Sequence, residues 1–248
     1  MGSVAEIAPD IYRVTVFVPE FNLEFHHFLV KDDEPLLFHT GFRRTFAEVR
    51  EGIASVIDPA RIRWIGFSHF ESDECGALNE WLAVARHAEP VCGLLGAMVT
   101  VNDFSSRPAR ILTENDVLPT GRRRFRFQHT PHLPHGWDAG VLYEETERTL
   151  FCSDLLLQTG KCEPVTRDDV IGRARETLAG LEAGPFAGVT PYTAHTGVML
   201  NKLADLKPSL LITQHGSAYA GDGEKALRAL DGVYREILGK PAAAGSAR

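Results

Sequence analysis

The sequence predicts a layered α/β sandwich, in which two sheets pack face to face and helices cover their outer surfaces. Two observations predict this fold. Short β-branched and aromatic runs alternate with amphipathic stretches, and the order of strands followed by helices occurs in two similar successive halves, with no linker between them. The 248 residues, 44% of them hydrophobic, are enough to bury a sizeable core. We expect one domain over residues 1–240 and a loose C-terminal tail over 241–248.

The first half opens with strands and continues with helices between strands. Runs bounded by turn residues predict strands at 11–18, 23–30, 34–41 and 63–68. Apolar positions at helical spacing predict helices at 44–57 and 76–88. The short apolar pieces of 90–101, which glycine interrupts, continue the alternation.

The second half repeats the order of strands and then helices. The same signals predict strands at 111–118, 123–131, 139–145, 149–156 and 208–216. They predict helices at 167–183, 196–207 and 223–239.

Charge and composition exclude several classes of partner. A formal net charge of -7 argues against the basic surface that nucleic-acid binding requires. The N-terminus carries acids where a secretory signal needs a positive segment followed by a long apolar one, and no later run approaches membrane-spanning length. We therefore expect a soluble, cytoplasmic protein with no nucleic-acid or membrane partner.

Two other features of the sequence are expected to be structural. The cysteines are far apart and include no C-x-x-C pair, which favours buried thiols over a disulfide framework: Cys75, Cys92, Cys152 and Cys162. A cluster of arginines suits either an anion site or, as we favour, a hairpin with alternate residues in water: Arg122, Arg123, Arg124 and Arg126.

Histidines and acids gather where predicted strands end. His69, Glu71 and Asp73 follow the buried run at 63–68 and lie where the chain enters the next predicted helix. Because strand ends at one edge of a sheet collect side chains from distant segments, these three can turn into one pocket. Further donors occur at later strand ends, namely His132, His135, Asp138, Asp154 and His215.

Taken in order, these residues resemble the metallo-β-lactamase superfamily. Its hydrolases carry H-x-H-x-D-H in the first loop, whereas this chain has H-x-E-x-D at His69, Glu71 and Asp73. That pattern resembles the branch of flavodiiron proteins and flavin-free oxygen-binding diiron proteins, and the intervals to His135, Asp154 and His215 are similar to those of that branch. The resemblance covers about residues 5–240 and implies the metallo-β-lactamase-like αβ/βα sandwich.

The resemblance also implies a dinuclear metal site. It assigns His69, Glu71 and His135 to one metal, Asp73 and His215 to the second, and a bridging position to Asp154. Three imidazoles and three carboxylates without a thiolate suit iron or manganese, although affinity alone favours zinc. Two iron ions are therefore the expected cofactor, with zinc or manganese as alternatives.

Several side chains near this set have open roles. Glu74 stands where the family usually has histidine, and is either a solvated acid at a helix N-terminus or an extra ligand. His39 is expected to orient Asp154 or another ligand, and His132 is an alternative to His135. The remaining candidates around the metals are one of the adjacent strand residues His26 and His27, which must face opposite sides, and His195, a cap or a pocket residue.

The function implied by the resemblance is binding of dioxygen or nitric oxide at a non-haem diiron site, with reduction as a possible further activity. Only 33 residues follow His215, so no flavin domain is expected within this chain, and electrons would come from an external donor. A homodimer is expected by analogy. The alternative is a dinuclear metallohydrolase of esters, lactones, thioesters or phosphoesters. A metal-bearing module without turnover is a third class.

Overall fold

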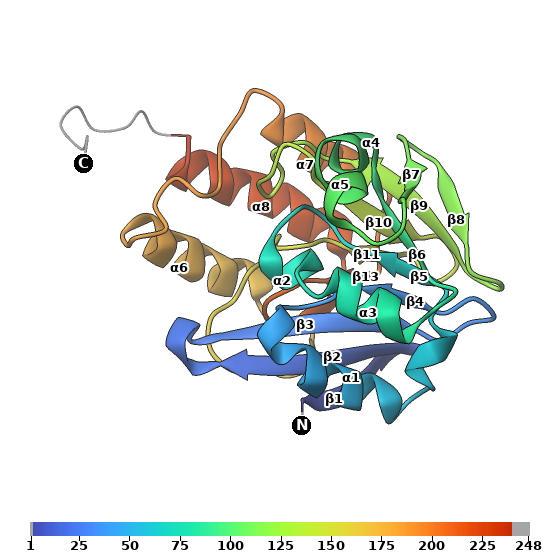
Figure 1. The fold of residues 1–248 in the computed structure, drawn as a ribbon. Helices are drawn as coiled ribbons and strands as arrows, with labels where there is room; N and C mark the ends of the chain where they lie inside the picture. Colours follow the sequence, from blue (N-terminus) through green and yellow to red (C-terminus); the bar gives the residue numbers. More distant parts are fainter. Residues whose placement is uncertain (1, 240–248) are drawn as a thin grey trace.

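Two mixed sheets stack face to face, and helices cover both outer surfaces (Figure 1). The structure is a computed structural model that describes residues 2–239. The predicted α/β sandwich is confirmed. The tail expected at 241–248 lies outside the described residues.

The first sheet has the strand order β1-β2-β3-β4-β5-β6-β7. Its strands are antiparallel from β1 to β4 and parallel from β4 to β7. Their bounds are β1 (Ser3–Ala8), β2 (Ile11–Val18), β3 (Leu23–Val30), β4 (Leu36–Phe38), β5 (Trp64–Gly66), β6 (Glu89–Gly93) and β7 (Arg110–Leu112).

The second sheet has the order β12-β14-β13-β11-β10-β9-β8. Strands β8 to β11 form an antiparallel meander, and β11 pairs with β13 in parallel, so that both strands end at the same edge. The bounds are β8 (Val117–Pro119), β9 (Arg124–His129), β10 (Gly140–Glu144), β11 (Thr149–Phe151), β12 (Val165–Thr166), β13 (Leu210–Ile212) and β14 (Ala218–Ala220).

The helices lie outside the two sheets (Figure 1). The α-helices are α1 (Phe46–Ala54), α2 (Ser72–Cys75), α3 (Leu78–Val84), α4 (Leu94–Gly96), α5 (Asn102–Phe104), α6 (Val170–Glu182), α7 (Thr196–Ala204) and α8 (Gly223–Ile237). The 3-10 turns η1 (Pro19–Phe21), η2 (Arg43–Thr45) and η3 (Pro59–Arg61) and the π-helical turn η4 (Ala97–Val101) complete the set.

The hydrophobic core has three layers. One packs α1 and α3 on the first sheet, with Trp81 fully buried. The middle layer joins the two sheets through residues such as Phe28 and Phe151, whose rings pack edge to face with their centroids 5.8 Å apart. The third packs α6, α7 and α8 on the second sheet. Alternation along β3 places Phe25, His27 and Leu29 on the opposite face from His26 and Phe28.

The structure corrects the prediction of one strand at 111–118. Residues Arg110–Leu112 form β7 in the first sheet, and Val117–Pro119 form β8 in the second, so the chain crosses between the sheets here. The prediction failed because Asp116 forms a turn, its carboxylate accepting from Thr113 N and Oγ1. Strands β1, β12 and β14 were not predicted.

The arginine cluster is the expected hairpin. Arg122 pairs with Asp10 and Asp32, and Arg124 and Arg126 pair with Glu145. Along β9, Arg124 is exposed and Arg126 is half-buried, whereas Phe125 and Phe127 are buried. Among the cysteines, three are buried and Cys162 is half-buried, and all four are free.

Among residues 2–239, no helix is both long and apolar enough to cross a bilayer.

Candidate metal centre

The six predicted ligands converge from both sheets at one edge of the sandwich. Three come from the segment after β5, where His69 lies in the loop, Glu71 is the N-cap residue of α2, and Asp73 belongs to α2. The other three are supplied by the second sheet. His135 lies in the loop between β9 and β10, Asp154 follows β11, and His215 follows β13.

Glycines permit the tight loops around this edge. Gly216, directly after His215, has φ +116°, and a Cβ there would lie 2.7 Å from the Gln158 side chain. Gly41 has φ +83°, and its Cβ would lie 2.7 Å from the ring of His27. Because both positions combine a positive φ with a close neighbour, a larger residue would displace the chain beside the site.

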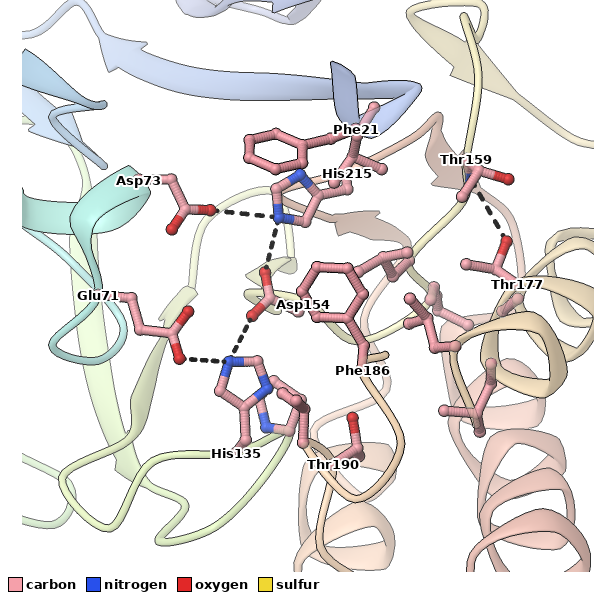
Figure 2. A pocket seen from close by; sticks show the side chains of 18 of the residues that line it. Phe21, Glu71, Asp73, His135, Asp154, Thr159, Thr177, Phe186, Thr190 and His215 are labelled. Atoms are coloured by element: carbon pink, nitrogen blue, oxygen red, sulfur yellow. Dashed lines mark hydrogen bonds and ion pairs between the residues drawn. The ribbon is translucent and has the colours of Figure 1, made fainter. Parts of the chain in front are cut away.

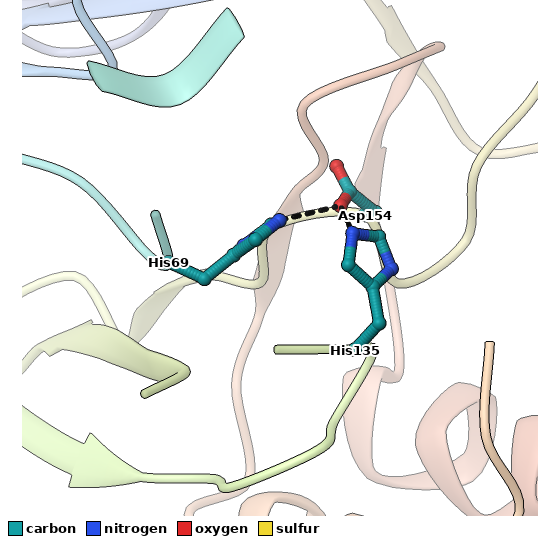
Figure 3. Close-up of side chains that lie close together, drawn as sticks. All are labelled: His69, His135 and Asp154. Atoms are coloured by element: carbon teal, nitrogen blue, oxygen red, sulfur yellow. Dashed lines mark ion pairs between the residues drawn. The ribbon is translucent and has the colours of Figure 1, made fainter. Parts of the chain in front are cut away.

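Asp154 stands at the centre of the cluster. Its Oδ2 lies 3.6 Å from His69 Nε2 and 3.3 Å from His135 Nε2 (Figure 3), while its Oδ1 lies 3.3 Å from His215 Nε2. The two oxygens of one carboxylate thus face two separate groups of donors. This arrangement is the one that a carboxylate bridging two cations requires.

Glu71 and Asp73 complete these two groups. Glu71 Oε1 lies 3.2 Å from His135 Nε2, and Asp73 Oδ2 lies 3.5 Å from His215 Nε2 (Figure 2). The Glu71 side chain is 48% exposed, whereas Asp154 is 6% exposed. The open side of the cluster is therefore the side of Glu71.

The orientation of His69 is fixed by hydroxyl groups. Ser68 Oγ lies 2.9 Å from His69 Nδ1, 2.8 Å from Ser153 Oγ and 3.1 Å from His39 Nε2. His39 Nδ1 in turn contacts Gln214 Oε1. With Nδ1 engaged in this way, His69 presents Nε2 to the cluster. His39 thus contacts Ser68 and Gln214, and it reaches the ligands through Ser68.

The adjacent histidines of β3 have different surroundings. His26 Nε2 lies 2.8 Å from Gly216 O and its Nδ1 lies 3.1 Å from Thr15 Oγ1, so His26 braces the loop that carries His215. His27, on the opposite face, is fully buried, and neither ring nitrogen has a hydrogen-bond partner within the described part of the chain. Burial lowers the pKa of His27 to about 4 despite the nearby charge of Asp73.

Two of the histidine candidates lie away from the cluster. His132 is exposed and has φ 62°, whereas His135, three residues later, points to Asp154. His195 is exposed at the N-cap of α7, where its side chain makes no capping hydrogen bond. The structure does not bring either ring to the six converging residues, because each lies in an exposed turn.

Glu74 has two alternative roles by its sequence position, a solvated acid or an extra ligand. Its side chain is fully buried, so the interpretation as a solvated acid at a helix N-terminus is wrong. The burial arises because Thr40 N donates to Glu74 O at 2.6 Å and Gly41 N to Asp73 O at 3.1 Å, which presses α2 against the loop after β4.

Charge in the cluster perturbs its titrating groups strongly. Burial alone would raise the pKa of Glu71, but hydrogen bonds and charge from His135 and His69 outweigh it and lower this pKa to about 2. Burial would lower the pKa of His215, but Asp154 and Asp73 raise it to about 10. The carboxylates thus strongly favour positive charge at their centre.

The donor atoms fit a pair of metal ions. Among residues 2–239, three groups of side chains each offer ligand atoms within 4.8 Å of one another: His69, His135 and Asp154; His69, Glu71 and Glu74; and Asp73, Glu74 and His215. Several buried donors in these sets lack a hydrogen-bond partner, including His69 Nε2, His135 Nε2 and Asp154 Oδ1. Because buried polar atoms are almost always partnered, cations are the natural partners of these donors.

An apolar pocket of about 250 Å³ opens onto the cluster (Figure 2). Glu71, Asp73, His135, Asp154 and His215 form its polar end. The apolar walls come from η1 and β3, from α6, from residues 186–190 and from α8. Phe21, Phe186 and Val189 at this pocket are 46%, 49% and 47% exposed.

Comparison with known proteins places the chain in a family. A family model described as ODP family beta lactamase matches residues 23–216. The chain belongs to this family. The matched segment contains all six converging residues, from His69 to His215.

Curated relatives of the ODP-family chain are flavodiiron proteins, which confirms the resemblance to that branch. Rubredoxin-oxygen oxidoreductase of Megalodesulfovibrio gigas is 27% identical over 206 residues, covering 79% of this chain and 49% of that protein. Flavo-diiron protein FprA2 of Clostridium acetobutylicum is 25% identical over 239 residues, covering 95% and 59%. The chain thus spans about half the length of the curated relatives that it matches.

Solved structures share the fold of the ODP-family chain. Rubredoxin oxygen:oxidoreductase from Desulfovibrio gigas has a TM-score of 0.77 at 20% identity and covers 97% of this chain and 63% of that one. A fragment of the diflavin flavoprotein A 5 from Nostoc has a TM-score of 0.78 at 15% identity and covers 95% and 96%.

Proposed function

We propose that the cluster holds two iron ions. In this proposal His69, Glu71 and His135 bind one ion, Asp73 and His215 bind the other, and Asp154 bridges them. The observation that supports it best is the position of Asp154, whose two oxygens face the two groups of donors. A mixed set of imidazoles and carboxylates without a thiolate suits iron better than a histidine-richer set.

We further propose that the site binds dioxygen or nitric oxide. A pair of ferrous ions supplies a reducing site that binds such gases. The protein holds His69 with Nε2 toward the cluster through Ser68, and apolar side chains line the pocket beside it. An apolar pocket suits an uncharged diatomic gas, because such a molecule gives up little hydration on entering it.

Gas binding can be tested on protein loaded anaerobically with Fe(II). We expect two irons per chain by elemental analysis and a change in the visible and Mössbauer spectra on exposure to O2 or NO. Asp154→Asn should lose both, because it weakens the group shared by the two ions. Iron-loaded protein whose spectra do not respond to either gas would contradict the proposal.

Reduction of the bound gas would require electrons from a partner. The name of the Megalodesulfovibrio gigas relative couples rubredoxin to oxygen, so we propose a rubredoxin-like donor. We also propose a homodimer, in which the exposed Phe21, Phe186 and Val189 are covered. Anaerobic turnover of NO with a reduced rubredoxin and sedimentation of the purified chain test the two proposals separately.

Hydrolysis is a second candidate function, favoured by the size of the pocket. Its volume of about 250 Å³ is much larger than the ~30 Å³ that a water-sized molecule occupies. A metal-held hydroxide attacking an apolar ester, lactone, thioester or phosphoester would use that space. Turnover of an ester panel by the zinc or manganese form, with loss in Asp73→Ala, would favour hydrolysis. Absence of turnover with every substrate would count against it.

A further inference from the structure

Glu74 is a buried carboxylate that lacks a hydrogen-bonding partner among residues 2–239. Its side chain is 0% exposed, and neither oxygen makes a hydrogen bond. Its ion-pair contact among residues 2–239 is with His69, whose Nε2 lies 3.9 Å from Glu74 Oε2. Its carboxyl also lies against Asp73, with Asp154 and Glu71 nearby. A charged carboxylate buried among three others is unfavourable unless cations lie between them.

Position within the cluster distinguishes Glu74 from an ordinary acid. A Glu74 oxygen lies within 4.8 Å of ligand atoms of His69 and Glu71. A Glu74 oxygen also lies within 4.8 Å of ligand atoms of Asp73 and His215. These are members of the two proposed ligand groups, one for each ion. Asp154, the proposed bridge, contacts histidines of both groups.

We propose that Glu74 is a seventh ligand and a second carboxylate bridge between the two metal ions. The inference rests on the proposed dinuclear site. Carboxylate chemistry explains the residue type, because a carboxylate offers two oxygens to two ions, whereas a histidine side chain in this position would offer one nitrogen to one ion.

A second carboxylate bridge changes the charge of the ligand set and the number of open coordination positions. With Glu74, four carboxylates and three histidines surround the pair. The added negative charge favours hard and highly charged ions, so it stabilises the ferric state over the ferrous state and lowers the reduction potential. It also occupies coordination positions, so that the open side of the pair is confined to the side of Glu71 and the apolar pocket.

The test compares four variants of the full chain, loaded anaerobically with Fe(II). Glu74→Gln keeps the shape and the hydrogen-bonding capacity of the side chain but removes the anionic ligand, and Glu74→Ala removes both. Glu74→Asp keeps the carboxylate, and Glu51→Gln is the matched control at an exposed position. The measurements are iron per chain, the Mössbauer spectrum, the reduction potential and the circular dichroism of the metal-free protein.

We expect Glu74→Gln to resemble Glu74→Ala. Both should fold, retain fewer than two irons at limiting Fe(II), and show altered Mössbauer signals for both irons and a raised reduction potential. The affinity for at least one ion should fall more than the roughly 10–100-fold typical of residues that only support a ligand. Glu74→Asp should keep more iron than Glu74→Gln, and Glu51→Gln should match the wild type.

Two results would overturn the inference about Glu74. If Glu74→Gln binds two irons with wild-type Mössbauer signals, Glu74 is a hydrogen-bonding or packing residue and the inference is wrong. If the wild-type chain itself binds no pair of irons, the dinuclear site has failed, and the comparison between variants is then made with Zn(II) and Mn(II) binding. Equal affinity of wild type and Glu74→Gln for those metals would overturn the inference as well.

Discussion

Glu71 is the residue through which the first loop differs from the hydrolase pattern. Its carboxylate replaces a histidine of H-x-H-x-D and faces His135 at 3.2 Å on the exposed side of the cluster. Replacing an oxygen donor by an imidazole nitrogen should shift metal preference from iron toward zinc.

Glu71→His therefore tests the proposed origin of metal choice. We expect the ratio of iron to zinc bound in competition to fall by about tenfold, a difference of about 1.4 kcal/mol. Elemental analysis after equilibration with both metals measures it. Glu71→Gln is the control, because glutamine adds no imidazole nitrogen to the ligands. An unchanged ratio of iron to zinc in Glu71→His would contradict the prediction.

His27 predicts a pH dependence of stability for the metal-free protein. Its folded-state pKa of about 4 lies below the unfolded value of about 6.5. The unfolded chain therefore binds the proton more readily between these values, and stability falls as pH decreases through this window. One such group contributes a slope of about 1.4 kcal/mol per pH unit.

His27→Leu should reduce the slope of the free energy of unfolding against pH by about 1.4 kcal/mol per pH unit, the contribution of one proton. Denaturant unfolding followed by circular dichroism between pH 4.5 and 7 measures the free energy of unfolding of both proteins. A slope that is the same in wild type and His27→Leu would show that His27 does not remain neutral in the folded chain.

The sequence predicted which side chains converge at the candidate site. His69, Glu71, Asp73, His135, Asp154 and His215 converge as their spacing and the resemblance suggested. The burial of Glu74 could not be predicted, because it depends on contacts between α2 and the loop after β4. Nor could the exposure of His132, which follows from a left-handed backbone conformation.

At the level of elements, long amphipathic helices were predicted better than short strands. The predicted helix 167–183 contains α6, and 223–239 contains α8, each with residues outside the helix only at its ends. By contrast, β12 has two residues, too few for a periodic pattern. The change of sheet after β7 depends on pairing between distant strands, which local sequence does not contain.

The N-cap of α6 controls one wall of the pocket. The Asp169 carboxylate accepts hydrogen bonds from Ile171 N at 3.0 Å and Gly172 N at 2.9 Å. Asp169→Ala should lower the free energy of unfolding by about 1 kcal/mol. Asp169→Asn, an equally good cap, should retain most of the stability. Urea unfolding measures both, and equal losses in the two variants would contradict the capping role.

At the scale of the whole molecule, a buried ion pair connects the two sheets at a point outside the metal cluster. Arg123, directly before β9, lies with its Nη1 3.3 Å from Oε2 of the fully buried Glu144 and also donates to Pro9 O, in the turn between β1 and β2. Removing the arginine leaves a buried carboxylate without its counter-ion.

Arg123→Met should therefore cost about 3 kcal/mol of stability. The double variant Arg123→Met/Glu144→Gln should recover part of that loss, because it buries no unpaired charge. Thermal and denaturant unfolding measure the cycle. A double variant that is no more stable than Arg123→Met would indicate that packing, rather than charge, is responsible.

The division of the ligands between the sheets gives the metal ions a mechanical role. Each proposed ion joins a loop of the first sheet to a loop of the second, so the pair would act as a removable cross-link. At a free metal concentration of 100 times Kd, it would add about 2.7 kcal/mol to the folded state. Chelation should then speed cleavage by a protease, and Asp154→Asn should be cleaved quickly with or without chelator. The lifetime of the chain would follow the supply of metal.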